Sequence, residues 1–560
     1  MNKIWKIKKP HPELQLKFSR ELDIHPLISQ LLINRGITLV KEARSFMCAD
    51  LSCLHDASKI KDMDKAVSRI KKAKHDKEKI LIFSDYDCDG ITACVLLKEV
   101  LQKTGIHTSH YIPHRINEGY GLNEGIGEIV KAKKADLLIS VDCGITAFAE
   151  IAALQEKGCD TIVIDHHQPQ KDKLPKAVAI INPRREDCNY PFKELASVGL
   201  VYKLCQALTG DKLLSELDLV ALGTIADVMS LNGENRILVK EGLKQISVSR
   251  RPGIKALLEI CKIKDKELTV KMVGYILGPR INACGRLDSA EKAMELLLAQ
   301  NMDEALELAR GLDKQNRDRQ KIQEKVLSEA LNLVEKEVNF KDQNIIVVSQ
   351  EGWHPGVLGI VASRITEKFY RPTIVISLEN GIGRGSARSI ENFHLFDALT
   401  KCGHLLEEFG GHRHAAGLTI LHSNISQFKK LINEFAKLNI LPEDLSPSLN
   451  VDCQIPLSTL NVEVVRDIEN LAPFGMGNPI PVFCSRNLKI KSEPMLMGKE
   501  TIKFWVSDGK LTAQVVGFGR ADLLSTLLPE TNLDLVYSLS IDEWQDEPAV
   551  QMELKDIKIN

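Results

Sequence analysis

Three short apolar segments, each followed directly by acidic or histidine side chains, limit the fold of this chain more than any other feature. They are Ile80-Leu81-Ile82-Phe83, residues 135–141 and residues 160–164. Helix-compatible sequence separates them, over residues 90–104, 123–134 and 147–157. This alternation of strand and helix predicts an α/β fold with a parallel, doubly wound sheet.

The residues that follow these strands are suited to binding cations. The motifs are Asp85-Tyr86-Asp87-Cys88-Asp89-Gly90, Asp142-Cys143-Gly144 and Asp165-His166-His167, and a fourth carboxylate, Asp227, ends the strand-like stretch 223–226. Parallel strands place their carboxyl ends at one edge of a sheet, where open α/β sheets bind ligands, so these side chains should converge. We therefore predict a dinuclear metal site. For the first motif taken alone, a solvated acidic turn is the alternative.

Electrostatics supports a metal site over a simple turn. Asp85, Asp87 and Asp89 alternate along an extended segment, so their carboxylates point the same way and repel one another. A divalent cation would relieve this repulsion. Carboxylates with imidazoles and without thiolates favour Mn²⁺ or Mg²⁺, and the imidazoles favour Mn²⁺. Cys88 and Cys143 lie inside the motifs, and we expect them to be small space-filling residues that point away.

Composition limits the remaining classes of protein. A chain of 560 residues is too long for one core and suggests about three or four domains. The net charge of −1 gives no global polycation, so any nucleic-acid surface must be local. The 13 cysteines show no paired metal or disulfide spacing. We find no membrane-spanning run and no signal-peptide core, so we expect a cytoplasmic protein, with a monomer as the simpler state.

The pattern along the chain predicts five regions. They are an N-terminal extension packed on the first lobe (1–75), the first α/β lobe (76–290), a connecting helix (291–340), a second α/β lobe (341–440) and a C-terminal β-barrel of the oligonucleotide-binding (OB) type (448–560). The charged stretch 302–338 should form one or two helices, with Asn301 as cap and Gly311 as a break. In the barrel, Phe504, Trp505, Phe518 and Trp544 could stack bases, although core positions are the alternative for each.

Three segments rich in glycine and basic residues are predicted to be loops. They are residues 278–286, 381–389 and 410–417. Each is a weak signal alone, because glycine-rich segments are often simple turns. The last two offer backbone amides, hydroxyls and guanidinium groups, which suit a phosphate. Together with an acidic metal centre in the other lobe, they imply a phosphodiester held between the lobes.

Taken together, these motifs resemble a known family. The four acidic and histidine motifs resemble those of the DHH phosphoesterase superfamily, and residues 410–417 resemble the signature of its DHHA1 domain. More narrowly, the chain is similar to the bacterial RecJ exonucleases, on Pro113-His114-Arg115, residues 118–122, 278–283, 353–362 and 472–479. The resemblance implies a DHH domain, a connecting helix, a DHHA1 domain and an OB barrel.

The resemblance also implies an activity: 5′→3′ hydrolysis of single-stranded DNA to 5′-mononucleotides by two cations, Mn²⁺ or Mg²⁺, in recombination and repair. Candidate partners are a RecQ-type helicase and a single-stranded-DNA-binding protein. By the superfamily's pattern, Asp87 and Asp89 would each hold one cation and Asp142 would bridge both. His166 and Asp227 would complete one shell.

Other residues receive roles around those ligands. Asp85, Asp165 and His167 would stand behind the ligands or face the substrate, and Asp85 could also ligate directly. His167 and His412 join the catalytic set, with His412 on the scissile phosphate. The residues expected to bind the strand are Arg115, Arg280, Asn282, Ser386, Arg388 and His412.

Two other functions compete with this one. Relatives that cleave short oligoribonucleotides or cyclic dinucleotides are typically shorter and lack the terminal barrel, so residues 450–560 argue against them. A non-catalytic replication scaffold would have decayed motifs, whereas the five acidic and histidine ligands named above are all present.

Overall fold

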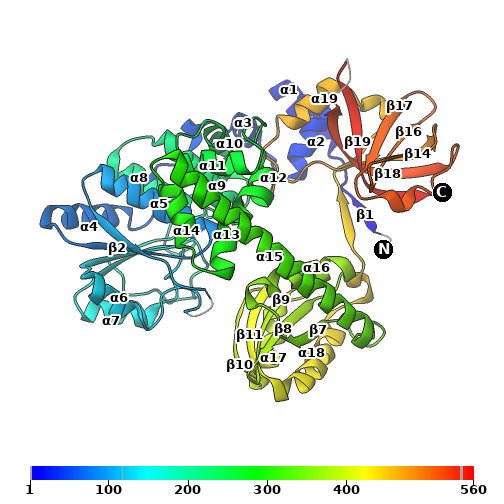
Figure 1. Ribbon diagram of the computed structural model, residues 1–560. Coiled ribbons are helices and arrows are strands. Elements are labelled where there is room, and N and C mark those ends of the chain that lie inside the picture. The colour runs from blue at the N-terminus through cyan, green and yellow to red at the C-terminus, as the bar shows by residue number, and fades with distance from the viewer. Residues whose placement is uncertain (1–2, 116–117, 543–546) are drawn as a thin grey trace. The chain divides into compact units, whose positions relative to one another are not determined.

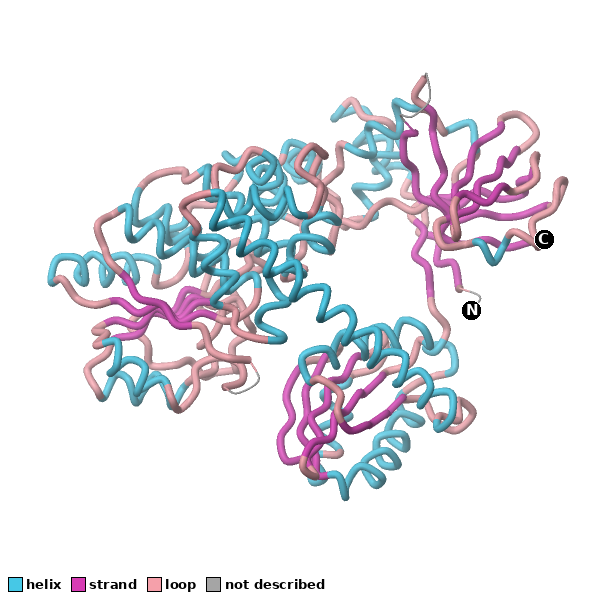
Figure 2. Tube along the Cα trace, viewed as in Figure 1, coloured by secondary structure: helices cyan, strands magenta, loops and turns pink. Residues whose placement is uncertain are grey.

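The computed structural model describes residues 3–115, 118–542 and 547–560, and the chain divides into two compact units (Figures 1 and 2). The first unit contains residues 56–227 and 242–447, and the second contains the residues up to 55, 228–241 and 448–560. Trp544, one of the aromatic residues considered for base stacking, lies outside the described residues. In the described ranges, no helix is both long enough and apolar enough to cross a membrane.

A parallel five-stranded sheet forms the first lobe of the first unit. Its strands, in spatial order, are β3 (Thr108–Tyr111), β2 (Ile80–Ser84), β4 (Leu137–Val141), β5 (Asp160–Ile164) and β6 (Ala179–Ile181). Helices α6 (Ile126–Lys133) and α7 (Phe148–Glu156) cover one face, and α4 (Met63–Asp76) and α5 (Cys88–Lys103) the other (Figure 1). Every residue of β2 and β4 is buried, as expected when helices cover both faces of a parallel sheet. The predicted doubly wound sheet is confirmed.

Helices continue the lobe beyond the sheet. They are α8 (Ser197–Thr209), α9 (Leu217–Ala226), α11 (Pro252–Ile260), α12 (Val270–Met272), a π-helical turn (Val273–Leu277), α13 (Gly278–Leu287) and α14 (Glu291–Leu298). Helix α10 (Gly233–Ser247) is shared, because its residues up to 241 belong to the second unit. Two predictions are wrong here. Residues 223–226 end a buried helix instead of a strand, and residues 278–286 form a helix instead of a loop. Proline is tolerated in the first turn of α13. Gly285 lies so near Tyr86 that a Cβ would be 2.7 Å from its carbonyl oxygen.

One uninterrupted helix, α15 (Met302–Glu337), leads to the second lobe. As predicted, the Asn301 side chain caps it, accepting a hydrogen bond from the backbone N–H of Glu304 at 2.9 Å. Gly311 does not break it. The helix packs against α11, α13 and α14 in the first lobe and against α16 and β7 in the second.

The second lobe is a mixed five-stranded sheet. Its strands, in spatial order, are β10 (Leu406–Gly411), β11 (Ala415–Leu421), β9 (Ile382–Arg388), β8 (Thr373–Glu379) and β7 (Ile346–Glu351), with helices α16 (Leu358–Phe369), α17 (Leu395–Lys401) and α18 (Ile425–Asn439). The predicted loop 381–389 is largely strand β9, and loop 410–417 is the β10–β11 turn with its flanking residues. Glycine serves packing in β9, because a Cβ on Gly383 would lie 2.8 Å from Ile376 and one on Gly385 2.9 Å from Leu418.

The second unit contains a seven-stranded sheet. Its spatial order is β13 (Cys453–Gln454), β14 (Phe483–Ile490), β18 (Asn532–Asp542), β19 (Ala549–Ile559), β17 (Thr512–Gly517), β16 (Thr501–Ser507) and β15 (Met495–Met497), accompanied by helix α19 (Val462–Glu469). The predicted hairpin β16–β17 is confirmed. Strand β16 also pairs with β14, which brings both sides of the sheet together. Phe504 is fully buried and Trp505 half-buried, whereas Phe518 is 62% exposed.

The N-terminal residues belong to this second unit, so the prediction that residues 1–75 pack on the first lobe is wrong for those up to 55. Strand β1 (Ile4–Ile7) pairs with β12 (Ser448–Val451). Helices α1 (Pro12–Leu22), α2 (Pro26–Asn34) and α3 (Val40–Cys48) share one apolar core with strands of the seven-stranded sheet. The apolar face of α2 is buried by residues that are distant in the sequence. Local sequence patterns do not reveal such contacts.

This shared core predicts where an N-terminal substitution acts. Phe18 is fully buried in it, so Phe18→Ala should destabilise the second unit by about 3–5 kcal/mol. Hydrogen exchange followed by mass spectrometry should show faster exchange in β14 and β18 and unchanged exchange in β2 and β4. Faster exchange in β2 and β4 alone would contradict the shared core. Leu438→Ala, at an 85% exposed position, is the control.

Candidate metal centre and phosphate site

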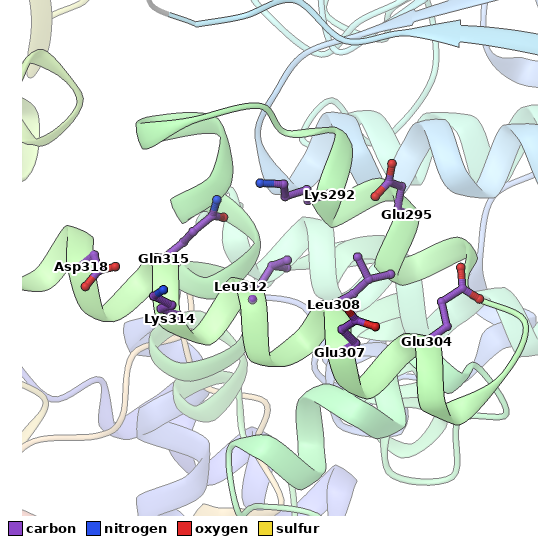
Figure 3. A pocket seen from close by; sticks show the side chains of 10 residues that line it. Lys292, Glu295, Glu304, Glu307, Leu308, Leu312, Lys314, Gln315 and Asp318 are labelled. Carbon is purple, nitrogen blue, oxygen red and sulfur yellow. The ribbon is translucent and has the colours of Figure 1, made fainter.

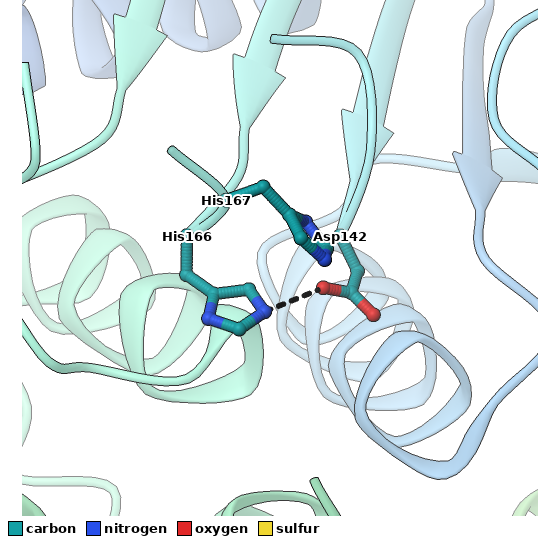
Figure 4. Close-up of side chains that lie close together, drawn as sticks. All are labelled: Asp142, His166 and His167. Atoms are coloured by element: carbon teal, nitrogen blue, oxygen red, sulfur yellow. Dashed lines mark ion pairs between the residues drawn. The ribbon is translucent and has the colours of Figure 1, made fainter. Parts of the chain in front are cut away.

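Three predicted motifs meet at one edge of the parallel sheet. Asp85 and Asp87 follow β2. Asp142 follows β4, and His166 and His167 follow β5 (Figure 4). Strand β4 pairs in parallel with both β2 and β5, which sets these three strand ends side by side. The convergence expected from the sequence is therefore present.

Seven side chains form one continuous cluster. Their ligand atoms fall into three groups, each within 4.8 Å: Asp85, Asp87 and Asp142; Asp142, His166 and His167; and Asp89, His166 and Asp227. Asp142 and His166 each belong to two groups, so the groups are joined. Nε2 of His166 lies 3.4 Å from Oδ1 of Asp142 and 3.5 Å from Oδ2 of Asp227. The structure thus brings together all six residues considered as ligands, with His167 beside them.

Backbone amides hold two carboxylates of the first motif. Asp87 caps α5: its Oδ1 accepts hydrogen bonds from the N–H groups of Asp89 and Gly90, at 2.9 and 3.1 Å. Asp89 lies at the N-terminus of α8, and its two oxygens accept from the N–H groups of Ser197 and Val198, at 2.8 and 2.9 Å. Helix N-termini stabilise negative charge, so both carboxylates are fixed before any cation binds.

Asp142 and His167 are positioned by their own neighbours. Asp142 adopts a left-handed backbone conformation (φ 63°), and its Oδ1 accepts from the Ser197 hydroxyl at 2.8 Å. Asp165 does not join the cluster. Its Oδ1 lies 2.7 Å from Nδ1 of His167, and its Oδ2 accepts from the Ile145 N–H at 3.0 Å. Asp165 therefore orients His167 and leaves Nε2 of that ring for the cluster.

Burial and mutual repulsion shift the acidity of the cluster. Burial, followed by the neighbouring carboxylates, raises the pKa of Asp89 to about 7 and that of Asp227 to about 8. The same causes hold the pKa values of Asp85 and Asp142 well above their usual range. Burial lowers the pKa of His166 to about 3, so this imidazole is neutral at pH 7. Neutral imidazole and uncompensated carboxylates are what a cation site requires.

The donor atoms fit Mn²⁺ or Mg²⁺. Oδ1 of Asp85 and Nδ1 of His166 are buried without a hydrogen-bond partner among the described residues. The thiols of Cys88 and Cys143 donate to backbone carbonyl groups. Oxygen donors with one or two imidazoles and no thiolate favour hard or borderline cations.

A second cluster, in the same unit, is cationic. We call Arg115, Arg286, Arg319 and Arg388 the guanidinium cluster; none of them forms an ion pair with a carboxylate of the described residues. Burial, together with the charges of the other three, lowers the pKa of Arg286 to about 10. The guanidinium of Arg115 lies 5.0 Å from the ring centre of Tyr86. Arg319 is buried and the other three are partly buried. Partly buried guanidinium groups without acidic partners are stabilised by an anion, and phosphate matches their geometry.

The second lobe leaves space at this cluster. Gly359 lies in the first turn of α16, where a Cβ would be 2.8 Å from Nη2 of Arg388 and 3.1 Å from Oγ of Ser386. A larger residue would fill the space between the helix N-terminus and these two polar side chains. Amide groups at a helix N-terminus favour phosphate, so glycine keeps a cradle open here.

Three residues predicted to bind the strand or the phosphate differ from the rest. Arg280 donates from Nε to Asp313 at 3.0 Å and so ties α13 to α15. Oδ1 of Asn282 accepts from the Cys88 N–H at 2.8 Å and supports the acidic loop. Both residues make structural contacts, and their role in binding the strand stays a prediction. His412 is exposed in the β10–β11 turn, and its side chain forms no hydrogen bond or ion pair with the described residues.

Sequence reasoning missed Arg286 and Arg319. Arg286 ends the glycine- and arginine-rich segment 278–286, which is predicted to be a loop and in which only Arg280 and Asn282 receive a role. The segment is a helix that packs Gly285 on Tyr86, and this packing places Arg286 beside Arg115. Arg319 lies in the charged stretch predicted to be a solvated helix face, yet it is only 8% exposed and donates to the amide oxygens of Asn316 and Gln323.

A cavity of about 820 Å³ lies elsewhere, beside α14 and α15 (Figure 3). Residues of both charges line it: Lys292, Glu295, Glu304, Glu307, Leu308, Gly311, Leu312, Lys314, Gln315 and Asp318. None of them belongs to the acidic cluster or the guanidinium cluster. The size of the cavity therefore does not mark the chemical site.

Comparison with known proteins agrees with this geometry. Three family models match: the DHH family N-terminal domain over residues 79–224, the DHHA1 domain over 342–438 and the RecJ OB domain over 451–556. The single-stranded-DNA-specific exonuclease RecJ of Bacillus subtilis (strain 168) is 37% identical over 559 residues, which cover 99% of this chain and 71% of that protein. The chain belongs to the RecJ family.

Solved structures of RecJ extend the match to the whole fold. RecJ from Thermus thermophilus in complex with Mn²⁺ matches with a TM-score of 0.85 and 29% identity, over 99% of this chain and 79% of that one. The Mg²⁺ complex from the same organism matches with a TM-score of 0.79 and 26% identity, over 99% and 78%. The predicted architecture of two α/β lobes and an OB domain is confirmed, and both expected cations occur in RecJ structures.

The acidic cluster predicts a pH-dependent response to metal. A carboxyl group whose pKa is raised by folding destabilises the folded chain once the pH exceeds its unfolded value. Without cations, the contribution of these carboxyl groups to stability should therefore fall between about pH 4 and pH 8, up to the pKa of Asp227. Cations bind the ionised form, so Mn²⁺ should raise the midpoint of thermal unfolding more at pH 8 than at pH 6.

The matched variants are Asp142→Asn, which should remove most of the Mn²⁺ shift, and Asp397→Asn, which alters an exposed carboxylate and should keep it. Equal Mn²⁺ shifts in the wild type and Asp142→Asn would contradict the assignment.

Proposed function

We propose that this chain hydrolyses single-stranded DNA from its 5′ end and releases 5′-mononucleotides, using two divalent cations, Mn²⁺ or Mg²⁺. The observation that carries the proposal is the joined acidic cluster, in which Asp142 and His166 each belong to two ligand groups. Membership of the RecJ family supports the choice of single-stranded DNA as substrate. The role would be in DNA recombination and repair.

The ligand groups suggest how two cations would be held. Asp85, Asp87 and Asp142 would hold one, and Asp89, His166 and Asp227 the other, with Asp142 bridging. When bound, the cations supply a nucleophile at neutral pH and stabilise the charge that develops on the phosphodiester oxygens.

The chain's own groups orient the reaction. The Ser197 hydroxyl donates to Asp142 and so directs its other oxygen. Burial lowers the pKa of His167, but the hydrogen bond and charge of Asp165 raise it more, to about 9. With Nδ1 facing Asp165, protonated His167 would donate from Nε2 to an oxygen of the phosphodiester. His412, whose side chain is exposed, is the further proposed contact with the scissile phosphate.

The guanidinium cluster would bind the 5′-terminal phosphate. Ser386 and Arg388 border the cradle at α16, and Arg115 and Arg286 contribute charge from the first lobe. Binding the terminal phosphate selects strand ends and fixes the polarity of attack. The proposal also places the protein in the cytoplasm, which cell fractionation can test. It further includes a RecQ-type helicase or a single-stranded-DNA-binding protein as partner, which pull-down from cell extract can test.

One assay compares three substrates. Purified protein with Mn²⁺ should release mononucleotides from a 5′-labelled single strand, and not cleave a blunt duplex or a dinucleotide. Asp142→Ala should abolish this release, because it removes the residue shared by two ligand groups, while Asp397→Ala should match the wild type. Release from the 3′ end would refute the polarity, and preferential cleavage of the dinucleotide would favour the competing phosphodiesterase function.

The phosphate site makes a separate prediction. Arg388→Ala should raise KM for a 5′-phosphorylated strand about tenfold or more, since a charge-assisted hydrogen bond is lost. The same variant should change KM for a 5′-hydroxyl strand much less. Arg384→Ala, on the same strand β9 but exposed, is the matched control. Equal effects on both strands would place the terminal phosphate elsewhere.

A further inference from the structure

Tyr275 is the most exposed aromatic side chain among the described residues, at 79%. Single exposed apolar residues are common and need no explanation, so exposure alone decides nothing. The local backbone is less ordinary. Tyr275 lies in the π-helical turn Val273–Leu277, whose end residues are both buried. Such turns are rare and are frequently found at functional sites.

This turn packs beside the acidic cluster. A Cβ on Gly274 would lie 3.5 Å from Cγ2 of Ile225, and one on Gly278 would lie 3.1 Å from Cβ of Ala226. Ala226 is the last residue of α9 and immediately precedes Asp227. Two glycines thus allow the turn to lie against the helix end that carries a proposed metal ligand.

The charge of the segment suits a nucleic-acid strand. Residues 268–287 contain no acidic residue, and although Arg280 is paired with Asp313, Lys271 and Arg286 form no ion pair with the described residues. Lys271 is exposed and lies one turn before Tyr275. Aromatic rings interleaved with basic side chains are typical of surfaces that bind single strands.

We infer that Tyr275 stacks on a nucleobase of the strand that is hydrolysed at the acidic cluster. The inference rests on the proposed function and adds a base contact to its phosphate contacts. Stacking does not depend on base identity, because every base offers a π-face. A ring held on a turn beside Asp227 would therefore orient strands of any sequence.

The experiment measures binding without cleavage, in full-length protein carrying Asp142→Ala. Tyr275→Ala should weaken binding of a fluorescent oligo-dT about fivefold or more, the lower range for loss of one stacked base. The affinity for the same strand with abasic residues along its length should not change between the two proteins. Tyr275→Phe, which keeps the ring, should bind oligo-dT as the parent does.

Leu438→Ala, another highly exposed apolar position, is the control and should leave binding unchanged. Equal losses on normal and abasic strands, or no loss on either, would overturn the stacking role. If the wild type neither binds nor cleaves a single strand, the proposed function itself fails. If the wild type cleaves and Tyr275→Ala binds oligo-dT normally, only the stacking inference fails.

Discussion

Repulsion between buried carboxylates is the constraint on which the first lobe depends. Asp85, Asp89 and Asp142 are each at most 4% exposed and lie at one sheet edge. The protein offsets part of this cost with backbone dipoles, since Asp87 caps α5 and Asp89 accepts from the first amides of α8. The repulsion that is not offset raises the pKa values of Asp89 and Asp142. Cations bound at this site would stabilise the fold. Without a bound cation, the folded protein therefore carries carboxylates whose mutual repulsion is only partly offset.

Local sequence was sufficient to predict the sheet and its acidic edge. The strands that carry Asp85, Asp142 and His166 are short buried runs with ligands directly after them, and parallel pairing makes their ends meet. The sequence predicts Asp227 correctly in the cluster but on the wrong element, because helix α9, buried except for its last residue, has no polar face that would give it a helical period. Apolar runs of that kind do not separate strand from helix.

Long-range packing explains what sequence patterns could not reveal. The partners of Arg280 and Asn282 lie 33 and 194 residues away, so their structural contacts leave no local signal. Arg319 looked like one charge on a solvated helix, and only the fold buries it beside Arg286. The glycines of strand β9 also depend on long-range packing, because they leave room for Ile376 and Leu418 on neighbouring strands. The local sequence pattern predicts a loop instead.

Helix α13 carries a consequence for product length. Asn282 supports the acidic loop and Arg286 belongs to the guanidinium cluster, and four residues of one helix separate them, a rise of about 6 Å. A hydrogen-bonded helix is a stiff spacer, so if the guanidinium cluster anchors the end of a strand as proposed, α13 would fix the distance from that end to the bond that breaks. The helix would act as a molecular ruler, and every round of hydrolysis would remove a piece of the same size.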